Sequence, residues 1–568
     1  MRLRTFLPLL GLPISAACSS AESDRASTEF AASQTLGVAA APGRSARAVR
    51  GGGGSSESFD HVLLVSIDGL HDIDMEKFIA AHPSSALAKL SHHGKRYTRA
   101  FVNRLDGSAT NPTDSFPGLL ALTTGGSSPT HGGWYDVSYS RDLFPYSATA
   151  PCTGTPGTAV AYDESIDSDL TFLWGSKTDD TPTHLVTVAR TRFNPTLLPY
   201  AKNGASCTPV FPHQFIRTNT IFNVAKNAGL HTAWSDKHLS YELVTGPTGD
   251  GLDDYFAPDI NSDPANSLIP TATPGGAFTD TTAKTELYDD FKVQAILNEI
   301  GGRWSDDGLA GASDLNGRPG VPAIFGMNFQ AVSVAQKSAF ATGGYATAAG
   351  DPGVELAEAL AHTDSSIGKM VDALAARDLL ESTLIIITAK HGQSPIDHSL
   401  VQKLSGDAVA ALLGTVAPVA GHIEDDVGLY WLKDPSTVRA AASILLTPPA
   451  GGIDPLADVV MTTSTDSSFV SMFGDPSKDP HTPDIIVKTK HGVIYSLSKK
   501  KNAEHGGFAD DDSHVGLLVS NPSIEEDTVR TEVRTKQVAP TIIRALGLDP
   551  NALDAVRIEG TKVLPDLL

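Results

Sequence analysis

The sequence predicts an α/β fold with a largely parallel central sheet that is covered by helices on both faces. Two observations support this prediction. Short, continuous apolar runs bounded by Gly or Pro recur along the chain, and such runs are typical of buried parallel strands. Helical patterns alternate with these runs, and this alternation indicates a parallel sheet with helices on each side.

The predicted elements begin at residue 61. Strands are expected at 61–70 (HVLLVSIDGL), 321–329 (VPAIFGMNF), 383–390 (TLIIITAK) and 514–520 (HVGLLVS), because each is rich in branched apolar residues. A long amphipathic helix is expected over 354–380. Open α/β sheets place their chemistry beyond the carboxyl ends of the strands, so the residues that follow these runs are candidates for a functional site.

Two stretches interrupt the alternating pattern. Residues 137–215 are rich in Pro, Thr, Ser and Tyr and have weak periodicity, and residues 396–482 are expected to carry a smaller α/β element. A loop of such length inside a compact domain is usually functional or forms a subdomain. We therefore predict one domain over 58–568 with insertions near 137–215 and 396–482.

The N-terminus has the pattern of an export signal. In residues 1–18, arginines precede a short apolar stretch that ends in small residues, and ISAAC resembles a bacterial lipoprotein processing site with Cys18 as the lipid-bearing residue. The apolar stretch is too short to span a bilayer. Residues 19–57, rich in Ala, Ser and Gly, are expected to form a flexible linker. We therefore expect an exported protein, either secreted, periplasmic or anchored to the envelope membrane through Cys18.

The cysteine content constrains both the first insertion and any metal site. If Cys18 is processed, Cys152 and Cys207 remain, and an even pair in an exported chain suggests one disulfide, with two unrelated buried thiols as the alternative. The chain contains no CxxC motif and no Cys/His spacing of the zinc-finger type. Any metal would therefore have to be held by carboxylates and histidines.

The formal net charge of −22 limits the class of partner. It argues against a nucleic-acid polymer held by backbone neutralisation, but a local positive site can still bind a small phosphate ester. The basic cluster at 499–501 (KKK) is most simply a solvated turn. We expect a small phosphate-ester substrate, and the sequence indicates no oligomeric state.

Three segments place polar groups where chemistry is expected. Asp68 follows the first strand, although Asp-Gly is also common in plain turns. Ser115 precedes an apolar helical run, so its hydroxyl either lies at an anion-favouring helix N-terminus or simply caps the helix. His505, before two glycines, suits a metal site or an ordinary polar loop, and His514 is more simply a core histidine.

The order of four motifs resembles one known family. VSIDG, PT-x-S-FPG-x(5)-TTG-x(4)-HGG, TAKHG and HGG resemble the nucleotide pyrophosphatase/phosphodiesterase (type I phosphodiesterase) branch of the alkaline phosphatase superfamily. QVAPTIIRALGLDP (537–550) also resembles the closing helix of that superfamily. The resemblance covers roughly 60–140 and 320–568. It implies an alkaline phosphatase-like fold and a metal-dependent hydrolase of phosphodiesters or nucleotide pyrophosphates.

The resemblance also implies roles for individual residues. Members of the family are implied to hold two zinc ions that flank a Ser or Thr nucleophile. Mapped onto this chain, the nucleophile is Ser115, the metal ligands are Asp68, Ser115, His391 and His505, and the phosphate-binding position falls on Asp136. The implied reaction forms a covalent phospho-serine that water then hydrolyses.

This chain departs from the family pattern at three of the implied ligands. Lys390 stands where the family's Asp-His-Gly motif has its aspartate, and Gln330 and Val334 stand where an aspartate and a histidine are implied. Valine cannot bind zinc and glutamine is a poor substitute for a carboxylate. The number of ions, one or two, and their identity therefore stay open, although zinc is the implied metal.

Three explanations of these departures are compatible with the sequence. Lys390 supplies the second positive charge beside a single metal, as in sulfatases of the same superfamily, which makes a sulfatase-like or phosphonate hydrolase the rival enzyme. Alternatively, the missing ligands come from elsewhere in the chain, or catalysis is lost and the chain is an envelope binding protein. Candidates for replacement ligands are His238, His362, Asp136 and Asp364, the last of which is more simply a helix N-cap.

Retained residues favour an enzyme over a binding protein. Ser115 persists beside the FPG turn, and Gly69, Gly392 and Gly506 persist at the edges of the implied site. The segment 230–256 is implied to line the substrate cleft. Within that segment, Trp234 and Tyr241 either stack on a planar group of the substrate or belong to the core.

Overall fold

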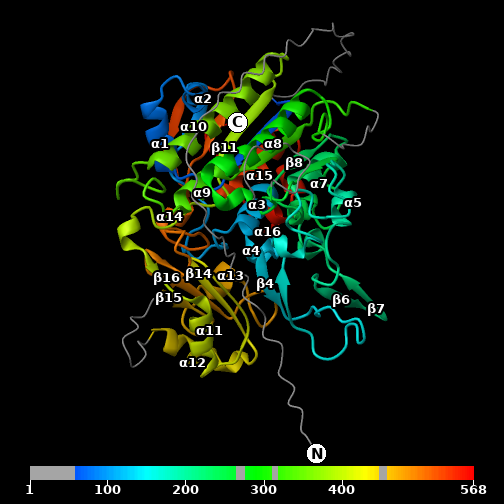
Figure 1. The fold of residues 1–568 in the computed structure, drawn as a ribbon, viewed down its shortest axis with the longest axis vertical. Coiled ribbons are helices and arrows are strands. Elements are labelled where there is room, and N and C mark those ends of the chain that lie inside the picture. Colours follow the sequence, from blue (N-terminus) through cyan, green and yellow to red (C-terminus); the bar gives the residue numbers. More distant parts are fainter. Residues whose placement is uncertain (1–57, 264–275, 310–316, 447–456, 568) are drawn as a thin grey trace, which may run out of the picture. The chain divides into compact units, whose positions relative to one another are not determined.

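The computed structural model describes residues 58–263, 276–309, 317–446 and 457–567, so the predicted export signal and linker lie outside the described residues. At its centre is an eight-stranded sheet (Figure 1). In spatial order the strands are β20 (Asp527–Val529), β2 (Gly94–Tyr97), β19 (Leu518–Ser520), β11 (Thr383–Thr388), β1 (His61–Ile67), β10 (Ile324–Phe329), β8 (Ala233–Ser235) and β9 (Asp254–Phe256).

Most neighbouring strands in this sheet are parallel. β11, β1, β10, β8 and β9 run in one direction, whereas β19 is antiparallel to both of its neighbours, β11 and β2. The predicted largely parallel α/β fold is confirmed. The single strand expected at 514–520 is wrong, because the chain changes sheets at Gly516, which packs against Leu70 and Met75. The first half of that run, β18 (His514–Val515), pairs with β3 (Ala100–Phe101) in a separate three-stranded sheet.

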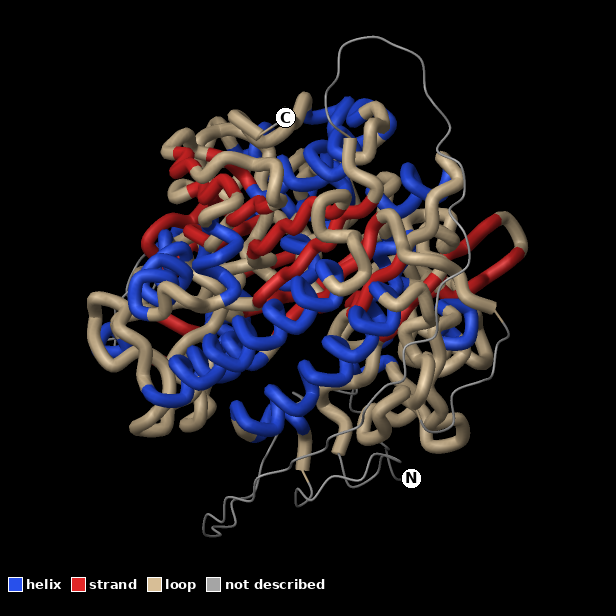
Figure 2. The backbone as a smooth tube through the Cα atoms, turned by 90° about the horizontal axis from the view of Figure 1, so that it is seen from above, coloured by secondary structure: helices blue, strands red, loops and turns tan. Residues whose placement is uncertain are grey.

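Helices lie on both sides of the strands (Figure 2). One group of helices that pack against each other consists of α8 (Thr282–Ile300), α9 (Ala331–Lys337) and α10 (Val354–Ala375). A second such group consists of α3 (Ser115–Thr124), α7 (Ile221–Asn227) and α15 (Val538–Ala545). Shorter elements include α1 (Asp72–Ala81), α2 (Ala86–Ser91), α4 (Ser128–His131) and α16 (Asp554–Glu559). α10 ends before the expected residue 380, because Asp378 adopts a left-handed conformation with φ 56°.

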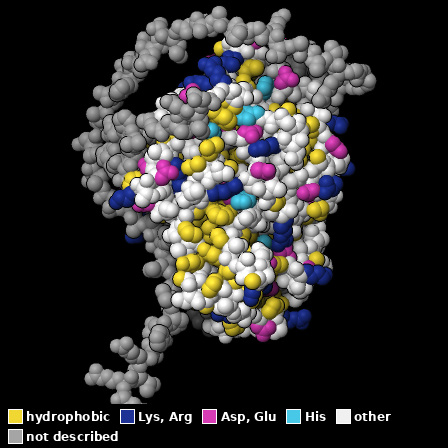
Figure 3. Space-filling model, turned by 90° about the vertical axis from the view of Figure 1, so that its right-hand side faces the viewer, with side chains coloured by type: hydrophobic (Ala, Val, Ile, Leu, Met, Phe, Trp, Pro, Cys, Tyr) yellow, Lys and Arg dark blue, Asp and Glu magenta, His cyan; other side chains and the backbone are white. Residues whose placement is uncertain are grey.

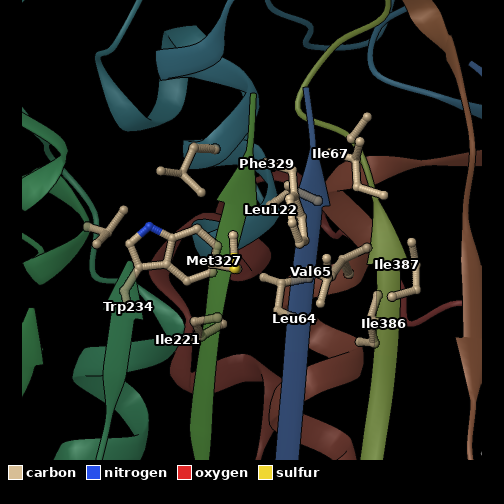
Figure 4. Packing of buried hydrophobic residues seen from close by; sticks show 14 of the residues in the cluster. Leu64, Val65, Ile67, Leu122, Ile221, Trp234, Met327, Phe329, Ile386 and Ile387 are labelled. Carbon is tan, nitrogen blue, oxygen red and sulfur yellow. The ribbon is translucent and has the colours of Figure 1, made fainter. Parts of the chain in front are cut away.

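The core between sheet and helices explains why the strands read as continuous apolar runs. Every residue of β10 and β11 is buried, as is nearly all of β1. Figure 4 shows Leu64, Met327 and Ile386 from three adjacent strands packed side by side. A parallel strand covered on both faces needs apolar side chains on both, which removes the alternation expected of a half-exposed strand.

The two insertions form structures of their own. Within 137–215, β4 (Val137–Ser140) pairs with β5 (Thr158–Ala161), and β6 (Tyr200–Asn203) pairs with β7 (Ser206–Pro209). Near 396–482 lies a four-stranded antiparallel sheet with its own core, seen at the bottom of Figure 1. It consists of β13 (Val419–Glu424), β14 (Val427–Leu432), β16 (Ile485–Thr489) and β15 (Ala457–Met461), with α11 (Gly406–Gly414) and α12 (Val438–Leu446) beside it.

The expected disulfide joins Cys152 to Cys207, whose Cα atoms are 5.8 Å apart. The bond links residues separated by 55 positions, so it closes most of the first insertion into a loop. In the chain-entropy model a loop of this length stabilises the folded state by about 4 kcal/mol. We expect Cys152→Ser/Cys207→Ser to lower the thermal midpoint by several degrees, and reductant to do the same to wild type only. Equal midpoints for both proteins under oxidising conditions would contradict this.

No helix among the described residues is long and apolar enough to cross a membrane. On the face drawn in Figure 3, basic and acidic side chains both occur over most of the surface, alongside hydrophobic ones.

Candidate functional site

The candidate site lies where four neighbouring parallel strands end. β11, β1, β10 and β8 are adjacent in the sheet and point the same way, so the residues that follow them meet at one edge. These residues are Lys390 and His391 after β11, Asp68 after β1, Gln330 after β10, and Asp236 and Lys237 after β8. The N-terminus of α3 brings Ser115 to the same edge.

Ser115 is the first residue of α3 and does not cap it. The N-cap is Asp114, whose side chain accepts a hydrogen bond from the backbone N–H of Phe116 at 3.0 Å. The reading of Ser115 as a plain N-cap is therefore wrong, because its neighbour already performs that function. The Ser115 hydroxyl is buried and faces the strand ends instead.

Three polar groups surround the Ser115 hydroxyl. Its Oγ lies 3.0 Å from His391 Nε2, 3.4 Å from Asp68 Oδ2 and 3.1 Å from the Lys237 ammonium, which donates to it. His391 Nδ1 lies 2.8 Å from the carbonyl oxygen of Gly392, so Nδ1 carries the proton and Nε2 is free to accept. The serine O–H can therefore donate to the imidazole, which is the arrangement of an activated nucleophile.

The two histidines of the site are neutral at pH 7. Burial lowers the pKa of His391 to about 4, and burial together with the charge of Lys337 lowers the pKa of His505 well below its ordinary value. The two rings lie against each other with centroids 4.2 Å apart. A neutral His391 that already contacts the serine is able to take up its proton.

Asp68 is the central anion of the site. Burial alone would raise its pKa, but the charges of Lys390 and Lys237 hold the pKa of this carboxyl well below its usual range. Lys390 Nζ lies 3.7 Å from Oδ1 and Lys237 Nζ lies 3.8 Å from Oδ2. Gln330 donates a hydrogen bond to Oδ2 at 2.6 Å. Oδ2 therefore accepts a hydrogen bond from Gln330, whereas the buried Oδ1 has no hydrogen-bond partner among the described residues and only the Lys390 ammonium approaches it.

Lys390 is completely buried and paired with carboxylates. Its Nζ donates to Asp236 Oδ1 at 3.3 Å, in addition to its approach to Asp68, and lies 4.5 Å from the centre of the Tyr241 ring. Burial lowers the pKa of Lys390, and the two carboxylates oppose that shift. The lysine that replaces the family's aspartate is therefore part of a buried charge network.

The sequence analysis missed two site residues, Asp236 and Lys237. Both follow β8 in the segment WSDKH, so they occupy the same position relative to a strand as Asp68 and His391 do. The side chain of Lys237 is 16% exposed, whereas that of Lys390 is fully buried, so Lys237 is the more accessible of the two lysines. Burial opposes its charge, but Asp68 and other acidic groups outweigh burial and raise its pKa.

Two of the predicted residues lie beside this centre. His505 stacks on His391, but its Nδ1 lies 4.0 Å from Asp114 and 3.8 Å from Asp425. Asp136 precedes β4, and its Oδ1 accepts the backbone N–H of Val137 at 2.7 Å. Burial and then the charge of Asp114 raise the pKa of Asp136 well above its ordinary value. Asp136 therefore lies at the border of the site, near the carboxylate of Asp114.

The candidate replacement ligands have other roles. His238 Nε2 lies 3.7 Å from Glu164, and His362 pairs with Asp290 at 3.3 Å between α10 and α8. Asp364 lies in the middle of α10, where it accepts backbone N–H groups at the start of α2. The expectation that Asp364 caps its own helix is wrong; it caps a neighbouring helix instead.

The aromatic residues of 230–256 and the late histidine belong mainly to the core. Trp234 is fully buried and donates its indole N–H to Asp236 at 2.9 Å. Tyr241 is also fully buried, with its ring against Lys390. His514 donates a hydrogen bond from Nε2 to the carbonyl oxygen of Thr98 at 2.9 Å and stacks on Phe101, away from the strand ends.

The side chains at this edge do not fit the two-metal centre that the resemblance implies. Gln330 donates to Asp68, and Val334 lies on α9 without a ligating atom. Within the described residues, no three His, Cys, Asp or Glu side chains stand close enough together to hold a metal ion. Where a cation would approach Asp68, the ammonium groups of Lys237 and Lys390 already stand.

Comparison with known proteins shows which family and which fold this chain resembles. The model of the family described as type I phosphodiesterase / nucleotide pyrophosphatase matches residues 311–442, which include β10, α10 and β11. No curated protein matches the sequence. The crystal structure of the alkaline phosphatase PafA is 11% identical, with 87% of this chain and 97% of that chain covered and a TM-score of 0.56. Murine ectonucleotide pyrophosphatase / phosphodiesterase 5 is 12% identical, with 87% and 99% covered and a TM-score of 0.48.

These matches confirm two predictions. The family match, over residues 311–442, confirms the resemblance to this family of phosphoester hydrolases. The likeness to PafA confirms the predicted alkaline phosphatase-like fold. The matched segment contains Gln330, Val334 and Lys390, so this chain departs from the implied ligand set inside the part that the family model recognises.

Gly118 holds α3 against the end of β11. A Cβ atom at this position would lie 2.2 Å from the carbonyl oxygen of Lys390. We expect Gly118→Ala to destabilise the protein by about 1–3 kcal/mol through overpacking, and to displace Ser115, with at least a ten-fold loss of activity. The matched control is Gly368→Ala within α10, where the added carbon meets its nearest neighbour at 3.6 Å. Equal melting temperatures and rates for the two variants would contradict this prediction.

Proposed function

We propose that this protein hydrolyses phosphodiesters or nucleotide pyrophosphates with Ser115 as the nucleophile. One observation carries the proposal: the buried Ser115 hydroxyl contacts both an accepting imidazole nitrogen of His391 and a donating ammonium of Lys237. A base to take the proton and a cation to favour the alkoxide are the two requirements for activating a serine.

The first chemical step transfers the phosphoryl group to the serine. Ser115 Oγ attacks phosphorus, its proton passes to His391 Nε2, and the bond from phosphorus to the leaving oxygen breaks. The leaving group departs as an anion, which solvent protonates when it is an alcohol. Lys237, whose ammonium touches Oγ, lies where a phosphoryl oxygen would come to rest and can hydrogen-bond it.

The second step returns the enzyme to its starting state. Water attacks the phospho-serine, and the bond from phosphorus to Ser115 Oγ breaks. The protonated His391 gives its proton back to Oγ, and the attacking water releases one proton to solvent. The start of α3 adds backbone N–H groups that favour the anion throughout. Neither step uses a metal ion, because the side chains present do not form the implied centre.

Further parts of the proposal concern substrate binding and location. Asp136, at the acidic border of the site, is proposed to contact the substrate, as the resemblance implies. Export is proposed from the pattern of residues 1–18 and is supported by the bond between Cys152 and Cys207, since such bonds persist in oxidising compartments. Mass spectrometry of the mature N-terminus would test this: a chain that begins at a lipidated Cys18 supports anchoring, and an unprocessed Met1 contradicts export.

A trapping experiment tests the proposed nucleophile. The purified protein is mixed with a chromogenic phosphodiester, quenched in acid during turnover and digested for mass spectrometry. We expect a mass increase of one phosphoryl adduct on the peptide that contains Ser115, and hydrolysis that is faster for phosphate esters than for the matching sulfate ester. Faster sulfate hydrolysis would favour a sulfatase-like enzyme, and no hydrolysis of either would favour a binding protein.

A further inference from the structure

Two lysines approach the carboxylate of Asp68, and this pair is the starting point of the inference. Lys237 and Lys390 come from different strands, β8 and β11, which β1 and β10 separate in the sheet. Both side chains nevertheless turn toward one carboxylate, with Nζ atoms 3.8 and 3.7 Å from the two oxygens of Asp68. Asp68 thus bridges two fixed positive charges.

The two ammonium groups differ in how they are held. Lys390 is fully buried between Asp236 and Asp68 and packs over the ring of Tyr241, so its position is fixed by the fold. Lys237 is partly exposed and donates directly to Ser115 Oγ, the atom that would carry the phosphoryl group. One lysine is therefore built into the wall of the site, and the other faces the reacting atom.

The groups around Asp68 explain why this site does not suit a divalent metal ion. An ion bound to Asp68 would lie close to both ammonium groups, which repel it, and Gln330 directs an amide N–H at the same carboxylate. The side chains that would complete its coordination are absent at Gln330 and Val334. Like charges within a few ångströms in a buried site cost far more than they do in water.

We propose that this site binds and transfers phosphoryl groups without a divalent metal ion, with Lys237 as the direct phosphate ligand and Lys390 as a fixed positioning charge that holds Asp68. The inference rests on the proposed function, because it assigns the electrostatics of the same reaction. Lys237 hydrogen-bonds the phosphoryl oxygens, and Lys390, which lies between Asp68 and Asp236, holds Asp68 in place beside Ser115. Positive charge that is fixed before the substrate arrives needs no reorganisation during the reaction.

Orthophosphate binding to the full chain provides a readout that is independent of turnover. The metal content of the protein as purified is measured by mass spectrometry, the protein is then dialysed against EDTA, and phosphate affinity is measured calorimetrically with EDTA or with added zinc. We expect bound metal far below one equivalent, and a phosphate Kd that EDTA and zinc change by less than about two-fold. Lys237→Met should weaken binding by about ten-fold or more, as the loss of a charge-assisted hydrogen bond predicts.

A matched lysine controls for the change in net charge. Lys369, on the solvent side of α10, is 51% exposed, and Lys369→Met should leave the phosphate Kd unchanged. Lys390→Met should weaken binding less than Lys237→Met does, with Tm reporting whether it folds. If it does not fold, the metal content and the EDTA titration of wild type still decide the question.

Four outcomes separate this inference from the proposed hydrolase. Metal near one equivalent in the active protein, or phosphate binding that EDTA abolishes and zinc restores, would overturn the inference and leave the hydrolase intact. Unchanged binding by Lys237→Met would also overturn it. Conversely, metal-free phosphate binding without hydrolysis of any ester would support the metal-free binding of phosphate by Lys237 while contradicting phosphoryl transfer and the hydrolase.

Discussion

Ser115→Ala is expected to reduce kcat by about 10⁴-fold or more, because removal of a covalent nucleophile leaves only the surrounding binding groups. The substitution deletes one oxygen from a buried site that already holds a full hydrogen-bond network around His391 and Lys237. It removes no helix cap, since Asp114 caps α3. The fold should therefore survive, and the loss should appear in the rate rather than in stability.

The measurement is steady-state hydrolysis of a chromogenic phosphodiester together with thermal denaturation. Ser108→Ala is the matched control, because Ser108 is an exposed serine that bonds only locally to Asp106 in the same region of the chain. We expect the control to keep the wild-type rate. The Ser115→Ala protein should also bind orthophosphate, since Lys237 is still present. A rate within ten-fold of wild type for Ser115→Ala would show that another group attacks phosphorus.

The parts of the fold that were predictable from sequence are those governed by local patterns. β1, β10 and β11 are buried on both faces, and a strand in this position needs a continuous run of apolar residues, which is visible in the sequence. The direction of β19 was not predictable, because a short apolar run carries no information on whether its neighbour runs parallel or antiparallel. The break at Gly516 depends on a packing contact with Met75, which is distant in sequence.

The same division applies to the site. Asp68, Ser115 and His391 were predictable because motifs with a known order surround them, and the structure brings all three within hydrogen-bonding or ion-pairing distance. Lys237 was not found, because β8 is only three residues long and does not read as a strand. The pairing of Lys390 with Asp236 joins residues 154 positions apart, and no local pattern encodes such a contact.

The role of His391 can be separated from a purely structural one. If His391 accepts the proton of Ser115, His391→Gln should lower kcat by about 10²- to 10⁴-fold, the range for loss of a general base. Glutamine retains a polar group of similar length that can bond to the serine hydroxyl, but it cannot take up a proton. The matched control is His481→Gln, since burial also lowers the pKa of His481 to about 4, and this residue lies beside Arg217 and Asp142.

The decisive comparison is the double variant Ser115→Ala/His391→Gln. Groups that act as one unit are not additive: once the nucleophile is gone, its base has nothing to activate. The double variant should therefore hydrolyse the diester no more slowly than Ser115→Ala alone, within about three-fold. If His391 only supported the fold, its loss would slow the reaction by the same factor with or without Ser115, and His481→Gln would show a comparable effect. If the two substitutions together reduced kcat by the product of their separate factors, His391 would not be the base that activates Ser115, and Lys237 would be left as the group that activates it.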